Sequence, residues 1–119
     1  MRLKLVALQV LTIAAVLPAQ AEVAELREFF EARIRPVLAE HCYRCHNSSG
    51  TSEGRLALDH RRGLRGGGKS GPAIIPGQAA ESRLIQAITY QHAKLRMPKD
   101  GPKLSAAVVA DFVQWIDTG

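Results

Sequence analysis

Apolar side chains recur at helical spacing in three segments of the chain. The first runs from about Ala24 towards Cys45 and the second from about Ala80 to Gln91. The third follows Ser105, a residue type that favours the N-cap of a helix. This pattern predicts a small all-α fold with about three main helices. The residues expected on their buried faces are Leu26, Phe29, Phe30, Ile34, Val37 and Leu38, then Leu84, Ile85 and Ile88, then Val108, Phe112, Trp115 and Ile116.

A proline interrupts the first helical segment. Pro36 lacks a backbone N–H, so we expect the segment to break or kink near Arg35. Proline is favoured in the first turn of a helix, so Pro36 can also open a second short helix that leads to Cys42.

The middle of the chain is rich in glycine. Eight of the ten glycines and two of the six prolines lie between Gly50 and Gly77, which predicts a long irregular loop. Gly63–Ser70 matches the phosphate-loop pattern G-x-x-x-x-G-K-[ST]. We reject a nucleotide site, because charged residues precede the motif and Gly71-Pro72 follows it, where a phosphate loop needs a buried strand and then a helix.

The N-terminus predicts an exported protein. Arg2 and Lys4 precede an apolar run of 13 residues, Leu5–Leu17, and the small-residue stretch Pro18–Ala21 follows. We expect a signal peptide over residues 1–21, cleaved before Glu22, and a periplasmic domain over residues 22–119. The apolar run is shorter than the about 20 residues that span a bilayer, so no stable membrane span is expected after cleavage.

Cleavage changes the charge balance of the chain. The mature part keeps 14 basic and 11 acidic residues, a net charge of +3 where the whole chain has +5. No basic face with aromatic platforms is apparent, so nucleic acid is not an expected partner. Arg61, Arg62, Arg65 and Lys69 form a modest basic loop, which we interpret as solvated, with docking of an acidic redox partner as the alternative.

The two cysteines carry the most specific chemistry. Cys42-Tyr43-Arg44-Cys45-His46 is a C-x-x-C-H sequence, the attachment pattern of a c-type haem. Each thiol adds to one haem vinyl group, and the adjacent imidazole reaches the iron. We therefore predict one covalent haem c per chain, anchored by Cys42 and Cys45 and ligated by His46. Phe112 and Trp115 are expected to pack against the first helix or the haem edge.

Other readings of the cysteine pair are a disulfide, half of a zinc site and a thioredoxin-like redox pair. A structural zinc site needs further thiolates or a spaced histidine pair, which His41, His60 and His92 do not form. A thioredoxin-like site needs alternating strands and helices around it, which the sequence lacks. We therefore retain the interpretation that the two cysteines bind haem.

A six-coordinate haem needs a second axial ligand, and Met97 is the only methionine left after signal cleavage. A thioether favours ferrous iron and raises the potential, as suits an electron carrier. His92 is the main rival for this role, followed by His41 and His60. On the other side, His46 should donate its second ring proton to a carbonyl, which we expect near Gly71-Pro72 or Pro76-Gly77.

Several blocks of the sequence resemble the planctomycete-type cytochrome c domain. They include the Phe29–Leu38 stretch, the His41–His46 haem motif, Gly54–Asp59, Gly66–Gly77 and Met97-Pro98. The resemblance covers about residues 28–119 and implies a small cytochrome-c-like fold around one haem, with His46 and Met97 as axial ligands. Members of that family often continue into longer exported proteins.

Three functions of a haem protein are compatible with this sequence. The first is a soluble periplasmic one-electron carrier, which needs a redox protein partner and no catalytic residues. The second is the haem module or subunit of a larger periplasmic oxidoreductase. The third is a haem enzyme or sensor with an open axial site. A thiol-disulfide protein that uses the two cysteines remains as a colourless alternative.

Overall fold

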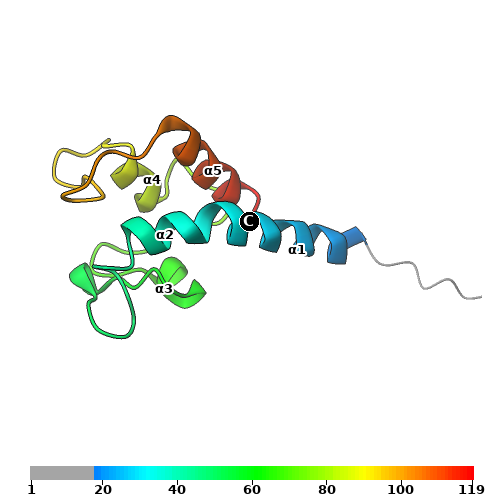
Figure 1. Ribbon diagram of the computed structural model, residues 1–119, viewed down its shortest axis with the longest axis horizontal. Coiled ribbons are helices and arrows are strands. Elements are labelled where there is room, and N and C mark those ends of the chain that lie inside the picture. The colour runs from blue at the N-terminus through cyan, green and yellow to red at the C-terminus, as the bar shows by residue number, and fades with distance from the viewer. Residues whose placement is uncertain (1–17) are drawn as a thin grey trace, which may run out of the picture.

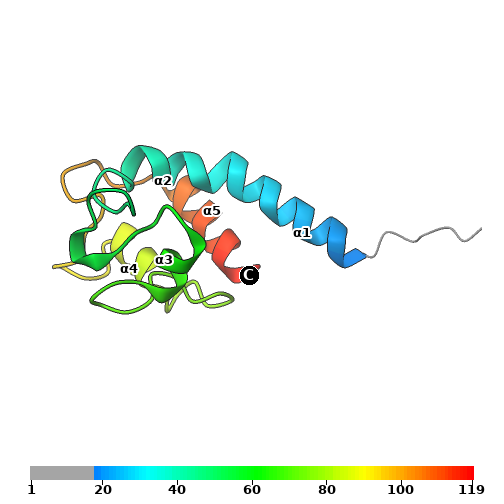
Figure 2. The same ribbon diagram turned by 90° about the horizontal axis from the view of Figure 1, so that it is seen from below.

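The computed structural model describes residues 18–119 (Figures 1 and 2). This part of the chain contains no β-strand, only the isolated bridges His46–Ser52 and Gly68–Gly71, so the predicted helical class is confirmed. The helical elements in chain order are α1 (Pro18–Phe29), η1 (Phe30–Ile34), α2 (Arg35–His41), η2 (Glu53–Arg55), α3 (Arg61–Gly66), α4 (Arg83–Ile88) and α5 (Ala106–Asp117).

The first three elements form one long helical rod, and α1 extends beyond the rest of the domain (Figures 1 and 2). The rod changes geometry at the predicted position. The turn η1 is π-helical, and the N–H of Arg35 donates to the carbonyl of Phe30, five residues back. Pro36 is the second residue of α2 and directly follows the π-helical turn, and it has no N–H to donate back into the rod. The wider turn thus lets the rod pass the proline, and α2 leads to Cys42 as predicted.

The core lies where the rod meets α5 and α4. Ile34 and Leu38 have no exposed surface, and Phe112 and Ile116 of α5 are nearly as deeply buried. The centroids of the Trp115 and Phe30 rings lie 5.3 Å apart. Trp115 therefore packs against the first helical segment, which is one of the two positions predicted for it. The residues of α4 predicted to be buried, Leu84, Ile85 and Ile88, all belong to this core.

The second predicted helix is shorter than expected. It begins after Ser82, whose buried hydroxyl donates to the carbonyl of Gln78 and accepts the N–H of Ile75. It ends at Ile88, because Tyr90 has a φ of 61°, which no helix accommodates. Ala79, Ala80 and Glu81 form a turn.

The Gly-rich region contains a helix that the sequence did not predict. His60 caps α3 by accepting the N–H of Gly63 on Nδ1 at 2.8 Å. The motif at Gly63–Ser70 therefore starts inside a helix that ends at Gly66, and Lys69 and Ser70 at its end lie in a turn and open no helix. This is the opposite of the phosphate-loop arrangement, in which the motif opens a helix.

The glycines of this motif are explained by close backbone contacts. Gly67 has a φ of 71° and a ψ of −157°, a region that glycine almost alone adopts. A Cβ at Gly67 would lie 1.8 Å from the carbonyl oxygen of Gly71, and one at Gly68 would lie 2.3 Å from that of Gly54. These glycines let three loop segments pack together beside the candidate site.

We expect Gly67→Ala to destabilise the domain by about 2 kcal/mol or more, because it combines a forbidden φ with a steric clash. Gly66→Ala is the matched control: Gly66 lies in α3, and its added Cβ meets no atom within 4 Å. That variant should change stability by less than about 1 kcal/mol, in the stabilising direction. Denaturant unfolding of both variants checks the pair, and equal losses would contradict this account.

The predicted positive and apolar parts of the signal peptide, residues 2–17, lie outside the described residues. The division into residues 1–21 and 22–119 stays a prediction. Among residues 18–119, no helix has the length and apolar character that crossing a membrane requires.

Candidate functional site

One cavity of about 390 Å³ brings together Cys42, Cys45, His46 and Met97. The two cysteines and the histidine come from the turn that follows α2, and the methionine comes from the loop between α4 and α5. Fifty residues lie between the histidine and the methionine in sequence, so the fold itself assembles this set.

A single helical turn carries the C-x-x-C-H residues. The N–H of Cys45 and the N–H of His46 both donate to the carbonyl of Cys42, at 3.2 and 3.0 Å. The turn keeps both thiols and the imidazole on the wall of the same cavity. No disulfide joins the two cysteines in the described part of the chain.

Burial raises the pKa of the Cys42 thiol to about 11, and the nearby Cys45 adds to the effect. The thiol is therefore protonated at neutral pH. Because the thiolate is the reactive form in disulfide exchange, Cys42 lacks the lowered pKa typical of redox-active cysteines. The thiol-disulfide alternative has no support from this environment.

Two backbone carbonyls fix the ring of His46. Its Nδ1 lies 3.0 Å from the carbonyl oxygen of Glu53 and 3.3 Å from that of Leu56. A carbonyl can only accept, so Nδ1 carries the proton and Nε2 keeps its lone pair for a metal. Our expectation that the orienting carbonyl lies near Gly71-Pro72 or Pro76-Gly77 is wrong.

The short turn η2 places these carbonyls. The N–H of Glu53 donates to the carbonyl of Cys45 at 3.0 Å, which ties η2 to the cysteine turn. Gly54 and Arg55 then adopt positive φ angles of 64° and 57° and reverse the chain. The sequence showed only one signal of this turn, the glycine at position 54, and we had assigned it to the irregular loop.

The loop that carries Met97 is anchored to α4. The N–H of Met97 donates to the carbonyl of Ala87 at 3.1 Å. Two cations of the same connection also lie over the ring of Tyr90: the guanidinium carbon of Arg96 at 5.4 Å and Nζ of Lys103 at 5.1 Å from its centroid. Backbone and cation–π contacts therefore hold the methionine at the cavity.

The histidines considered as rivals differ in position. His92 and His60 do not line this cavity: His92 lies 3.3 Å from the side-chain oxygen of Gln86, and His60 caps α3. His41 does line it, one residue before the first cysteine. Of the candidates distant from the cysteine turn, Met97 alone lines the cavity in the described part of the chain.

The rest of the lining is apolar inside and basic outside. Buried and half-buried side chains from the segments before and after α3 and from α4 form its apolar surface. Exposed cations outnumber the single acid, Glu53, by five to one. The apolar lining includes Leu56, Leu58, Ala73, Leu84, Ala87 and Ile88, and the cations are Lys69, Arg83, Lys94, Arg96 and Lys99.

Residues 42–101, slightly more than half of the chain, match the family model Planctomycete cytochrome C. The chain belongs to this family. The resemblance noticed in the sequence is thereby confirmed for the segment from the cysteine turn to the end of the methionine loop. No curated protein and no solved structure matches the chain.

Membership of the planctomycete cytochrome c family implies a haem and a role in electron transfer. The cavity fits that group. Two thiols and an imidazole with a free Nε2 stand on one stretch of its wall, a thioether stands on another segment, and apolar side chains lie between. The surrounding cations suit the negative charges of haem propionates.

Proposed function

We propose that this chain is an exported c-type cytochrome that transfers single electrons through one covalent haem with His46 and Met97 as axial ligands. The observation that carries the proposal is the single cavity lined by Cys42, Cys45, His46 and Met97. The haem, when bound, supplies a reversible ferric–ferrous couple.

The residues of the chain divide the remaining tasks. Cys42 and Cys45 hold the group through thioethers. The carbonyls of Glu53 and Leu56 keep the imidazole of His46 in one orientation and make it more basic. Met97 offers a neutral, soft ligand that favours the reduced state.

The buried leucines limit access of water, which also favours the less charged, reduced state of the site. The exposed cations form a rim that suits a redox partner with an acidic surface, either a separate protein or an associated oxidoreductase domain. No catalytic residue is needed for this function. The basic loop predicted from sequence contributes only Lys69 to this rim.

The experiment that tests the proposal is a visible spectrum of the protein expressed with its N-terminal segment and a cytochrome maturation system. We expect low-spin haem absorption in both redox states, colour that stays with the denatured chain, and the weak red-end band of iron bound to a thioether. A colourless product would return the cysteines to a disulfide or metal role. A covalent haem without the red-end band would remove Met97 from the ligand set.

A further inference from the structure

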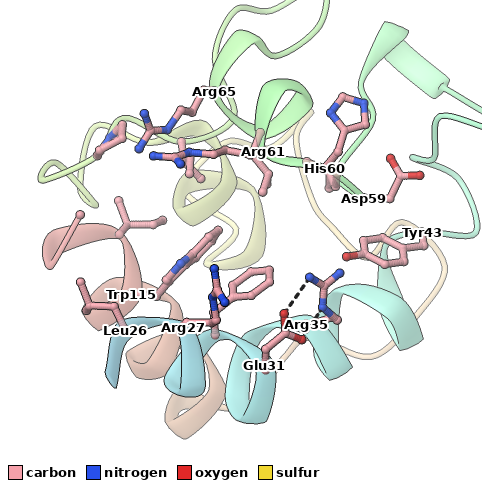
Figure 3. A pocket seen from close by; sticks show the side chains of 17 residues that line it. Leu26, Arg27, Glu31, Arg35, Tyr43, Asp59, His60, Arg61, Arg65 and Trp115 are labelled. Carbon is pink, nitrogen blue, oxygen red and sulfur yellow. Dashed lines mark hydrogen bonds and ion pairs between the residues drawn. The ribbon is translucent and has the colours of Figure 1, made fainter. Parts of the chain in front are cut away.

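A second cavity, of about 550 Å³, shares one lining residue, Leu58, with the candidate haem site. The second cavity is formed by the rod, α3 and α5 (Figure 3). Its volume falls in the usual range of small-molecule sites, about 300–1,000 Å³. This second cavity is separate from the haem site, because none of the polar residues that line the second cavity lines the haem cavity.

Four arginines meet at this cavity. Arg27 reaches it from α1, Arg35 from α2, and Arg61 and Arg65 from α3 (Figure 3). Among residues 18–119, Arg27, Arg61 and Arg65 form no hydrogen bond or ion pair through their side chains. The charge of Arg27 helps to lower the pKa of Glu31, but no carboxylate in the described part of the chain forms an ion pair with Arg61 or Arg65. A bound anion would give these two arginines a direct counter-charge.

The acids that line the cavity form an ion pair with Arg35 but with none of the other three arginines. Glu31 is engaged by Arg35, with Nε and Nη2 of the arginine 2.6 and 2.9 Å from its two oxygens. That hydrogen-bonded pair holds the pKa of Glu31 below its usual value. Asp59 directs one oxygen to the N–H and hydroxyl of Ser48, at 3.0 and 2.7 Å. Neither carboxylate pairs with an arginine of α1 or α3.

The cavity also has an aromatic wall. The half-buried ring of Trp115 stands between α3 and the rod (Figure 3), with the ring of Phe30 tilted against it. Leu26, Ile74 and Pro76 add apolar surface. A flat apolar group can lie on such a wall, while guanidinium groups bind carboxylate or phosphate through paired hydrogen bonds.

We propose that this cavity binds a small organic anion, an aryl carboxylate or aryl phosphate, with its ring against Trp115 and its anionic group held by Arg61 and Arg65. Arg27 closes the site from α1. Arg35 has only a supporting role, because it already contacts two other groups. It donates a hydrogen bond to Glu31, and its guanidinium carbon lies 4.9 Å from the centroid of the Phe30 ring. The inference is independent of the ligands assigned to the haem.

The test uses the whole isolated protein in its reduced state. Trp115 is the only tryptophan of the chain, so its indole N–H gives a single NMR signal that reports on the cavity. Phenyl phosphate and benzoate are titrated at constant ionic strength. Inorganic phosphate tests for charge alone, and benzyl alcohol tests for the ring alone. Calorimetry gives the affinities.

The variants are Arg61→Gln and Arg65→Gln, with Arg62→Gln as the matched control. Arg62 belongs to the same helix and is exposed, but it does not line the cavity. We expect phenyl phosphate or benzoate to shift the indole signal, and each of the first two variants to weaken binding about tenfold or more. Arg62→Gln should bind as the unchanged protein does. The haem spectrum of each variant serves to verify the fold.

Three results would overturn the proposal. These are no shift with either aryl anion, an equal loss with Arg62→Gln, and binding of inorganic phosphate as tight as that of phenyl phosphate. The last two would mean that the basic surface attracts anions without a formed site.

Discussion

Cys42→Ala combined with Cys45→Ala is expected to remove covalent haem completely. The two thiols are the only cysteines of the chain, and both line the cavity that contains His46 and Met97. Without them no thioether can form, so any haem that still enters the cavity would be held by its axial ligands and by apolar contacts alone. Haem staining of the chain after denaturing electrophoresis measures the covalent haem content. We expect this content to fall from one haem per chain to none.

A control for this result is Met97→Ala, which leaves both thiols in place. We expect that variant to stain as strongly as the unchanged chain, because the anchor and the sixth ligand are separate parts of the site. Persistent staining of the double cysteine variant would mean that the haem is attached elsewhere. Equal loss in Met97→Ala would mean that folding of the loop, and not thioether chemistry, decides attachment.

The sequence predicted those parts of the site whose chemistry depends on residue type. Thiols at a spacing of three followed by histidine have few other uses, and one methionine in a turn-rich segment left little choice of residue. The carbonyls at Glu53 and Leu56 escaped prediction, because every residue has a carbonyl and only the backbone path decides where it points. That path depends on the positive φ of Gly54 and Arg55, and arginine at such an angle has no sequence signature.

The fold shows the same division. Helix α5 was predicted with its cap, since the hydroxyl of Ser105 accepts the N–H of Val108. Helix α3 was not predicted, because its sequence contains two glycines, one buried leucine and three arginines, a composition typical of a loop. Its stability comes from tertiary contacts: Leu64 is buried, and its carbonyl accepts the N–H groups of Ala73 and Ile74. Local propensity cannot reveal a helix that distant segments hold in place.

The arginine cavity illustrates a further limit. We interpreted Arg61, Arg62 and Arg65 as part of one solvated basic loop, because the sequence does not show in which direction each side chain points. Folding of α3 turns the first and third of these towards Trp115 and leaves the second outside. The three arginines are close in sequence, but Arg61 and Arg65 line a cavity and Arg62 does not. The local sequence alone gives no reason to distinguish them.

Met97→Ala is expected to lower the midpoint potential and to remove the red-end absorption band while the haem stays covalently bound. A thioether is a weak donor that favours ferrous iron, and the water or hydroxide that replaces it favours the ferric state. The expected fall is on the order of 0.1 V, within the ~0.8 V over which axial ligands set haem potentials. Spectroelectrochemical titration of the purified protein measures the band and the potential together.

His92→Ala is the matched control, because His92 was the main rival ligand and lies outside the cavity. It should leave the band and the potential unchanged. Met97→His should restore a six-coordinate spectrum at a lower potential than that of the unchanged protein, since imidazole stabilises ferric iron better than a thioether does. If His92→Ala lowered the potential and Met97→Ala left it unchanged, then His92, and not Met97, would be the axial ligand. The contact between Met97 and the α4 carbonyl of Ala87 would then serve only to fold the loop.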